Sequence, residues 1–169
     1  MAERGYRHRS VGVNNVRGLD LHTWEVLAAS GASVSVTGTT TETTLATIPV
    51  PAKAMGPNGV LRITALWTYP NTANIKTLRH RFGGTAFNSQ PMTTTAMVQT
   101  FVMIRNANSE IAQKALNLSN TTPFATSTGT PMIGAVDTRI AQNLTISGLL
   151  ANTGETITLE SYIVELMRA

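Results

Sequence analysis

Side chains that commonly perform acid–base or metal chemistry are scarce in this chain of 169 residues. It contains three histidines, two aspartates and no cysteine. The one local cluster of acid and imidazole groups is Asp20-Leu21-His22 with Glu25. It would supply at most three metal ligands from a single segment. Hydrolysis needs a nucleophile with a base, or a suitable carboxylate pair. We therefore interpret the cluster as strand-start capping at the surface and predict no metal site.

His80 and the Gly83-Gly84 pair also favour structural roles. His80 lies between Arg79 and Arg81, whose positive charges disfavour protonation of the imidazole and repel a metal ion. Gly83-Gly84 interrupts an expected strand and predicts a turn or a bulge. The chain has no glycine loop of the kind that binds phosphate.

Three glutamates, Glu155, Glu160 and Glu165, lie in or near the last expected strand. Strand alternation places Glu160 on the same face as Tyr162 and Glu165 on the opposite face. We interpret them as a solvated face, because nothing in the sequence points to a glycosidase pair. The residue inventory predicts that the protein is not an enzyme, with no catalytic residue and no cofactor.

The elements that would position any site are β-strands. Short segments with β-type patterns recur every 10–15 residues between turn signals, and no helical stripe of any length occurs. This pattern predicts an all-β protein, an antiparallel β-sandwich or jelly roll of about eight strands. The expected strands are residues 23–27, 33–36, 42–50, 60–69, 75–82, 97–105, 111–118, 144–150 and 156–167.

The segment 60–69 has the clearest alternation. A hairpin-type turn at 70–74 is expected to lead into the segment 75–82. A strand with period-two hydrophobicity packs one face on the core and leaves the other wet or paired. The residues assigned to its core face are Leu61, Ile63, Ala65, Trp67 and Tyr69.

The segment 97–105 is apolar on both faces. Val98, Val102 and Ile104 share one face, whereas Met97, Phe101 and Met103 share the other. In an all-β protein this indicates a central strand, or a strand whose outer face meets a partner. We therefore predict Met97, Phe101 and Met103 as contacts between subunits of a homo-oligomer.

Composition divides the chain into an arm and a body. Charged residues make up 13% of the chain, about half the usual share, and 27 residues are threonine. Residues 1–17 hold four arginines and one glutamate, while the remaining 152 hold nine basic and eight acidic residues. We predict a basic N-terminal arm at 1–20 and a β-sandwich domain at 21–169. No apolar stretch is long enough to span a membrane, and the N-terminus lacks the apolar run of a secretory signal.

The basic arm predicts contact with an acidic partner surface, the alternative being a solvated terminus. The nearly neutral body offers no positive field for wrapping nucleic acid, so direct nucleic-acid binding is not expected. The anchoring candidates in the arm are Arg4, Tyr6, Arg7, Arg9 and Arg17.

Several stretches resemble a small module of virion proteins from tailed bacteriophages and prophages. The resemblance covers roughly residues 20–167, and the proline-bounded loop before Val60 is its most specific part. It implies a jelly-roll unit that forms an oligomer, often a trimer, with structural and binding roles and no shared catalytic residues. The stretches are Leu21-His-Thr-Trp-Glu-Val-Leu, Thr39-Thr-Thr-Glu-Thr-Thr-Leu-Ala-Thr-Ile-Pro-Val-Pro, Met55-Gly-Pro-Asn-Gly-Val-Leu-Arg-Ile, Arg81-Phe-Gly-Gly-Thr-Ala-Phe and Glu155-Thr-Ile-Thr-Leu-Glu-Ser-Tyr.

Two functions follow as hypotheses, and both place the protein on the surface of a phage particle. In the first, a dimer or trimer acts as a capsid decoration or cement protein and bridges subunits of the major capsid protein. In the second, the arm plugs into a tail or baseplate protein and the body is a receptor-binding, tail-fibre tip. Loops at 71–74, 88–94 and 120–130 would then recognise a host receptor or glycan through their Asn, Ser and Thr side chains.

Overall fold

Strands alone make up the regular structure of the described residues. The structure is a computed structural model, and it describes residues 23–116 and 129–169. The predicted all-β class is confirmed. The strands are β1 (Trp24–Ser30), β2 (Val34–Thr37), β3 (Thr43–Val50), β4 (Val60–Thr68), β5 (Lys76–Phe82), β6 (Thr85–Met92), β7 (Met97–Asn106), β8 (Gln113–Ala115), β9 (Met132–Gly134), β10 (Gln142–Leu150) and β11 (Thr156–Met167).

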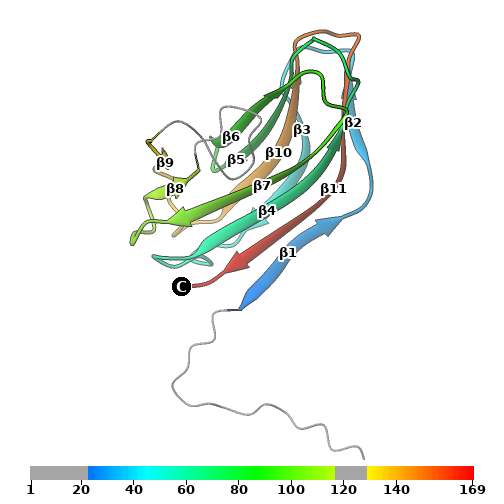
Figure 1. Ribbon diagram of the computed structural model, residues 1–169. Helices are drawn as coiled ribbons and strands as arrows, with labels where there is room; N and C mark the ends of the chain where they lie inside the picture. Colours follow the sequence, from blue (N-terminus) through cyan, green and yellow to red (C-terminus); the bar gives the residue numbers. More distant parts are fainter. Residues whose placement is uncertain (1–22, 117–128) are drawn as a thin grey trace, which may run out of the picture.

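Two antiparallel sheets face each other as a sandwich (Figure 1). The seven-stranded sheet has the order β1-β11-β4-β7-β8-β9, and β2 continues beside β1 along the same edge of β11. The four-stranded sheet has the order β3-β10-β5-β6. When β1, β8 and β9 are left out, the strand orders of the two sheets are β2-β11-β4-β7 and β3-β10-β5-β6. These orders are the connectivity of a jelly roll.

The core lies between the sheets and follows the alternation of each strand. All five residues predicted to form the core face of the segment 60–69 are buried, and Trp67 is fully buried. The indole Nε1 of Trp67 donates a hydrogen bond of 3.0 Å to the Thr100 hydroxyl on β7. This bond satisfies the ring's polar atom inside the core. On β5, Leu78 and Phe82 point inward as predicted.

The predicted hairpin at 70–74 is wrong. β4 and β5 lie in different sheets, so this segment crosses between the layers. A hairpin does occur one step later, where Gly83 and Gly84 join β5 to β6 with φ angles of +53° and +81°. Positive φ at both turn positions suits the right-handed twist of paired strands. The expected turn at this glycine pair is thus confirmed.

Three other strand predictions differ from the structure. β6 was not expected, because its sequence is polar and contains Pro91, yet it forms the edge of the four-stranded sheet, where proline is tolerated. β9 was also not expected. The predicted strand 111–118 is reduced to Gln113–Ala115 among the described residues.

Candidate functional site

The outer side of the seven-stranded sheet carries several exposed apolar side chains. On β7, Met97 is 61% exposed, and Phe101 and Met103 are half-buried on the same side. The opposite side of β7 holds Val102 and Ile104 in the core. The predicted two-faced strand is therefore confirmed. The role of its outer residues as subunit contacts stays a prediction.

Strand register extends this apolar surface across the sheet. Ile163 on β11 lies opposite Thr64 on β4, which in turn lies opposite Phe101 on β7. Ile163 is 45% exposed and shares the outer side with Val26 on β1, which is 58% exposed. We call this surface the apolar face, and it consists of Val26, Met97, Phe101, Met103, Leu116 and Ile163.

The apolar face contains a shallow groove at one side. Phe101, Met103, Arg105 and Leu116 enclose about 260 Å³. Leu116 follows β8 and points to the outer side, because Ala115 before it is buried against the core. The groove can accept an apolar side chain from outside the chain.

Charged groups within the sheet's outer side are neutralised locally. The guanidinium of Arg62 donates two hydrogen bonds of 2.6 Å to the Glu165 carboxylate and lies 4.0 Å from the centre of the Trp24 ring. The hydrogen bond from Arg62 lowers the pKa of Glu165. Because this ion pair needs no external partner, Arg62 and Glu165 can be covered without leaving either charge unpaired.

The outer side of the four-stranded sheet is polar by contrast. Glu42 accepts hydrogen bonds from Arg79, Arg81 and Ser147 at 2.6–2.8 Å. The hydrogen bond from Arg81 is the largest cause that lowers the pKa of Glu42 from 4.5 to about 2. On the same side of this sheet, Thr47 on β3 lies opposite Thr145 on β10, which lies opposite Arg81 on β5. The two outer sides of the sandwich therefore differ in chemistry.

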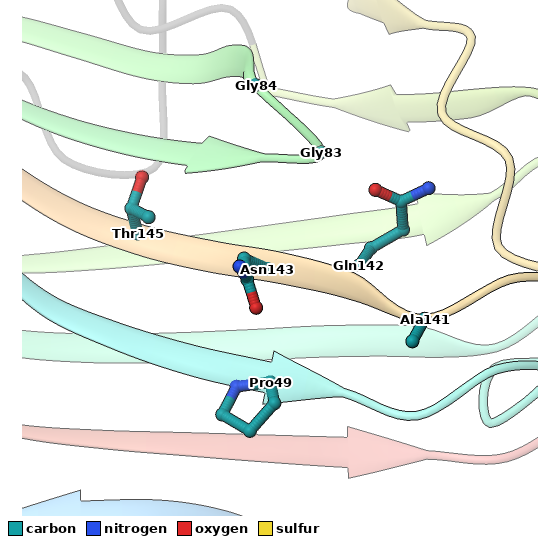
Figure 2. Close-up of a pocket in the computed structure, with 7 residues that line it drawn as sticks. All are labelled: Pro49, Gly83, Gly84, Ala141, Gln142, Asn143 and Thr145. Carbon is teal, nitrogen blue, oxygen red and sulfur yellow. The ribbon is translucent and has the colours of Figure 1, made fainter.

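An open depression of about 500 Å³ lies where β3 and β10 meet the β5–β6 turn (Figure 2). The Gln142 amide nitrogen is already used, because it donates a hydrogen bond to the Asp137 carbonyl oxygen. The side chains of Asn143 and Thr145 remain as polar groups that could bind a small hydroxylated ligand. The lining residues are Pro49, Gly83, Gly84, Ala141, Gln142, Asn143 and Thr145.

The glutamates of the last strand do not form one solvated face. Glu155 is buried and accepts hydrogen bonds of 2.7 Å from Asn74 and Thr72, which lower its pKa. A bulge at Glu160 shifts the register of β11 against β4. Glu160 therefore lies on the outer side with Glu165, whereas Tyr162 packs toward the core. The predicted pairing of Glu160 with Tyr162 on one face is wrong because of this extra residue.

His80 points inward and is fully buried, whereas Arg79 and Arg81 point outward. Its Nε2 atom lies 3.3 Å from the Thr100 hydroxyl, and its ring meets Trp67 edge-on. Burial lowers its pKa from 6.5 to about 4. The expected shift toward the neutral form thus arises from desolvation rather than from the neighbouring arginines.

Several predicted sites lie outside the described residues. These are the cluster members Asp20 and His22 and the anchoring candidates Arg4, Tyr6, Arg7, Arg9 and Arg17. Glu25, the third member of the cluster, contacts Arg168 at 3.0 Å. Among residues 23–116 and 129–169, no three acidic or histidine side chains gather closely enough to hold a metal ion. That part of the chain also has no helix long and apolar enough to cross a membrane.

The proposed recognition loops have mixed outcomes. Thr72 and Asn74 in the loop 71–74 are engaged with Glu155, and residues 88–92 of the expected loop 88–94 belong to β6. Most of the loop 120–130 lies outside the described residues.

The sequence analysis did not identify Val26, Leu116 and Ile163 as members of the apolar face. Period-two alternation within the expected 156–167 strand could have shown Ile163 as an apolar residue on the face of Glu165.

Comparison with known proteins leaves the function to be argued from the chain itself. No protein-family model and no curated protein matches it. Among solved structures, dimeric latent PorU from Porphyromonas gingivalis matches with a TM-score of 0.37 and 13% identity. The match covers 85% of this chain and 10% of the PorU chain, so this chain spans about one tenth of that length.

Proposed function

We propose that this protein is a structural component of a bacteriophage particle, a capsid decoration protein that bridges and stabilises capsid subunits. The observation that carries the proposal is the apolar face on one outer side of a jelly-roll sandwich whose other outer side is polar. Exposed apolar patches of this kind are typical of interaction surfaces. The resemblance of the sequence to phage virion modules supports the same role.

Two parts of the chain would have different roles in binding to the particle. The apolar face holds copies of the body together, since permanent contacts between subunits are more apolar than transient ones. The arginines of the arm bind an acidic surface of the major capsid protein. Each bound oligomer then adds contacts across a joint between capsid subunits and opposes the outward pressure of packaged DNA.

Particle binding by two forms of the protein tests this proposal. Deletion of residues 2–17 is expected to abolish binding to phage particles that lack the protein, while the thermal midpoint of the body stays within a few degrees. The matched control replaces the four arginines with glutamine at full chain length, and we expect it to bind as weakly as the deletion. Quantitative gels of virions should show hundreds of copies per particle. A few copies, or full binding by the deletion variant, would contradict the proposal.

The depression beside Asn143 and Thr145 favours a second function, a receptor-binding protein at the tail tip. Its amide and hydroxyl groups can form hydrogen bonds with a sugar. This function predicts few copies per particle, and it predicts that excess purified protein blocks adsorption of phage to host cells. Asn143→Ala should reduce the block, whereas Thr77→Ala, at the far end of β5 on the same sheet, should not. Adsorption that excess protein leaves unchanged would count against it.

A further inference from the structure

We propose that the apolar face is a self-association surface on which two copies of this chain pack sheet against sheet about a two-fold axis. The inference deepens the self-association that the proposed function includes. It assigns the contact to one side of the sandwich. It also selects a dimer over a trimer, because a two-fold contact closes after two copies.

The size of the surface suits a stable dimer. Nine consecutive residue pairs join β4 and β7, from Val60 with Arg105 to Thr68 with Met97. With strands about 4.8 Å apart and a rise of about 3.3 Å per residue, the strands β1, β11, β4 and β7 span roughly 19 by 30 Å. This flat area is roughly 600 Å². The accessible surface is larger because side chains project from it, and it approaches the roughly 800 Å² that each partner buries in a standard interface.

The register makes the face complementary to itself. Ile163, Thr64 and Phe101 form one row across β11, β4 and β7. A two-fold axis that runs parallel to β4 between facing copies lays β11 of one copy over β7 of the other. Ile163 of each copy then meets Phe101 of the second copy and the groove beside it. In the neighbouring row, Val26 lies opposite Glu165 and Arg62 lies opposite Met103, and Leu116 directly follows the last paired residue of β8. The same axis therefore brings Val26 toward Leu116 of the second copy and sets Arg62 against its own copy.

The charges favour a second copy over an acidic or basic partner. The ion pair of Arg62 with Glu165 is satisfied within the chain, and Glu160 accepts hydrogen bonds from Ser33 and Thr68. Arg105 and Lys114 are exposed near the edge of the face, where interfaces are normally polar. The strand on the axis is partly polar, with Arg62, Thr64 and Thr68 on its outer side, and the charge of Arg62 is paired within the chain. Such a strand can face an identical strand without a partner of complementary charge.

Sedimentation velocity of the full chain tests the inference directly. We expect the wild type to be a dimer and Ile163→Lys to raise the dimer dissociation constant about a hundredfold, because the lysine would be buried without a partner. Ile140→Lys is the matched control, since Ile140 is 58% exposed and lies away from the face. It should leave the dimer intact. Thermal unfolding checks that each variant folds, and Met97→Lys serves as a second variant at an even more exposed position.

The lack of cysteine allows a distance measurement of the same contact. Thr64→Cys places a spin label near the proposed axis, and Thr47→Cys places one on the outer side of the four-stranded sheet. With facing sheets about 10 Å apart, the labels at 64 should lie within about 20 Å of each other and those at 47 beyond about 30 Å.

A wild-type monomer, a trimer, or equal masses for Ile163→Lys and Ile140→Lys would overturn the inference. A monomer that binds particles would overturn the inference and the self-association in the proposed function, and only the capsid-decorating role would stand. A dimer that does not bind particles would support the inference and contradict the capsid-decorating role.

Discussion

At the residue scale, His80 is a fully buried side chain whose ionisation affects the stability of the fold. Its Nδ1 atom has no hydrogen-bond partner, and its Nε2 atom faces Thr100, which Trp67 also contacts. A protonated ring there would carry an unpaired charge between the two sheets. The neutral ring is therefore the form that the folded protein accommodates.

We predict that stability falls as the pH is lowered from 6.5 to 4. The pKa of His80 is about 4 in the fold against 6.5 unfolded, so only the unfolded chain gains this proton in that window. The contribution is fully present above pH 6.5, and about 3 kcal/mol is lost by pH 4. Urea unfolding at pH 7 and pH 4.5 measures it. His80→Leu, which leaves the bond between Trp67 and Thr100, should remove most of this pH dependence. Equal losses in wild type and variant would refute the prediction.

At the scale of elements, the two-residue turn between β5 and β6 depends on its first glycine more than on its second. A Cβ atom added at Gly83 would lie 2.4 Å from Val136 Cγ1, whereas one added at Gly84 would meet nothing within 4 Å. Both positions have positive φ. An alanine would therefore strain the backbone at either position, but only an alanine at position 83 would also collide with a neighbouring side chain.

Gly83→Ala should destabilise the protein by about 2 kcal/mol more than Gly84→Ala. Val136 is β-branched and buried, so it cannot move away by rotation at low cost. Chemical denaturation of the two variants gives the difference. If both variants lose the same free energy of unfolding, the contact with Val136 does not limit this turn.

At the scale of the whole molecule, charge and apolar surface are separated. Most of the net charge of +4 comes from residues 1–17, whereas the apolar face lies on the nearly neutral body. Salt screens contacts between exposed charges and leaves apolar burial intact. Attachment to a particle and self-association should therefore respond differently to ionic strength.

We predict that raising NaCl from about 0.05 M to about 0.5 M weakens particle binding by about tenfold and leaves the dimer intact. Co-sedimentation with particles measures the first quantity, and sedimentation velocity of the free protein measures the second. The full-length variant with glutamine in place of the four arm arginines is the control, and it should fail to bind particles at either salt concentration while remaining a dimer. A dimer that dissociates at high salt would contradict this assignment of roles.

Several strands were predictable because their pattern is local. The alternation of Leu61, Ile63 and Trp67 identified both β4 and its core face, and the two-faced pattern of 97–105 identified Phe101 as an outer apolar residue. β6 was missed, since a polar edge strand with a proline does not show the apolar alternation on which prediction depends. The crossing of 70–74 between sheets was mistaken for a hairpin, because a turn sequence does not specify which sheet receives the next strand.

The sequence by itself determined the all-β class, the core face of the clearest strand, and the concentration of charge near the N-terminus. Each depends on composition or on the two-residue period of a strand, which neighbouring residues carry. Only the tertiary structure decided that Val26, Ile163, Phe101 and Leu116 share one surface. Their alignment depends on strand order and on the bulge at Glu160, and a shift of one residue in register would turn a strand's side chains to the other face.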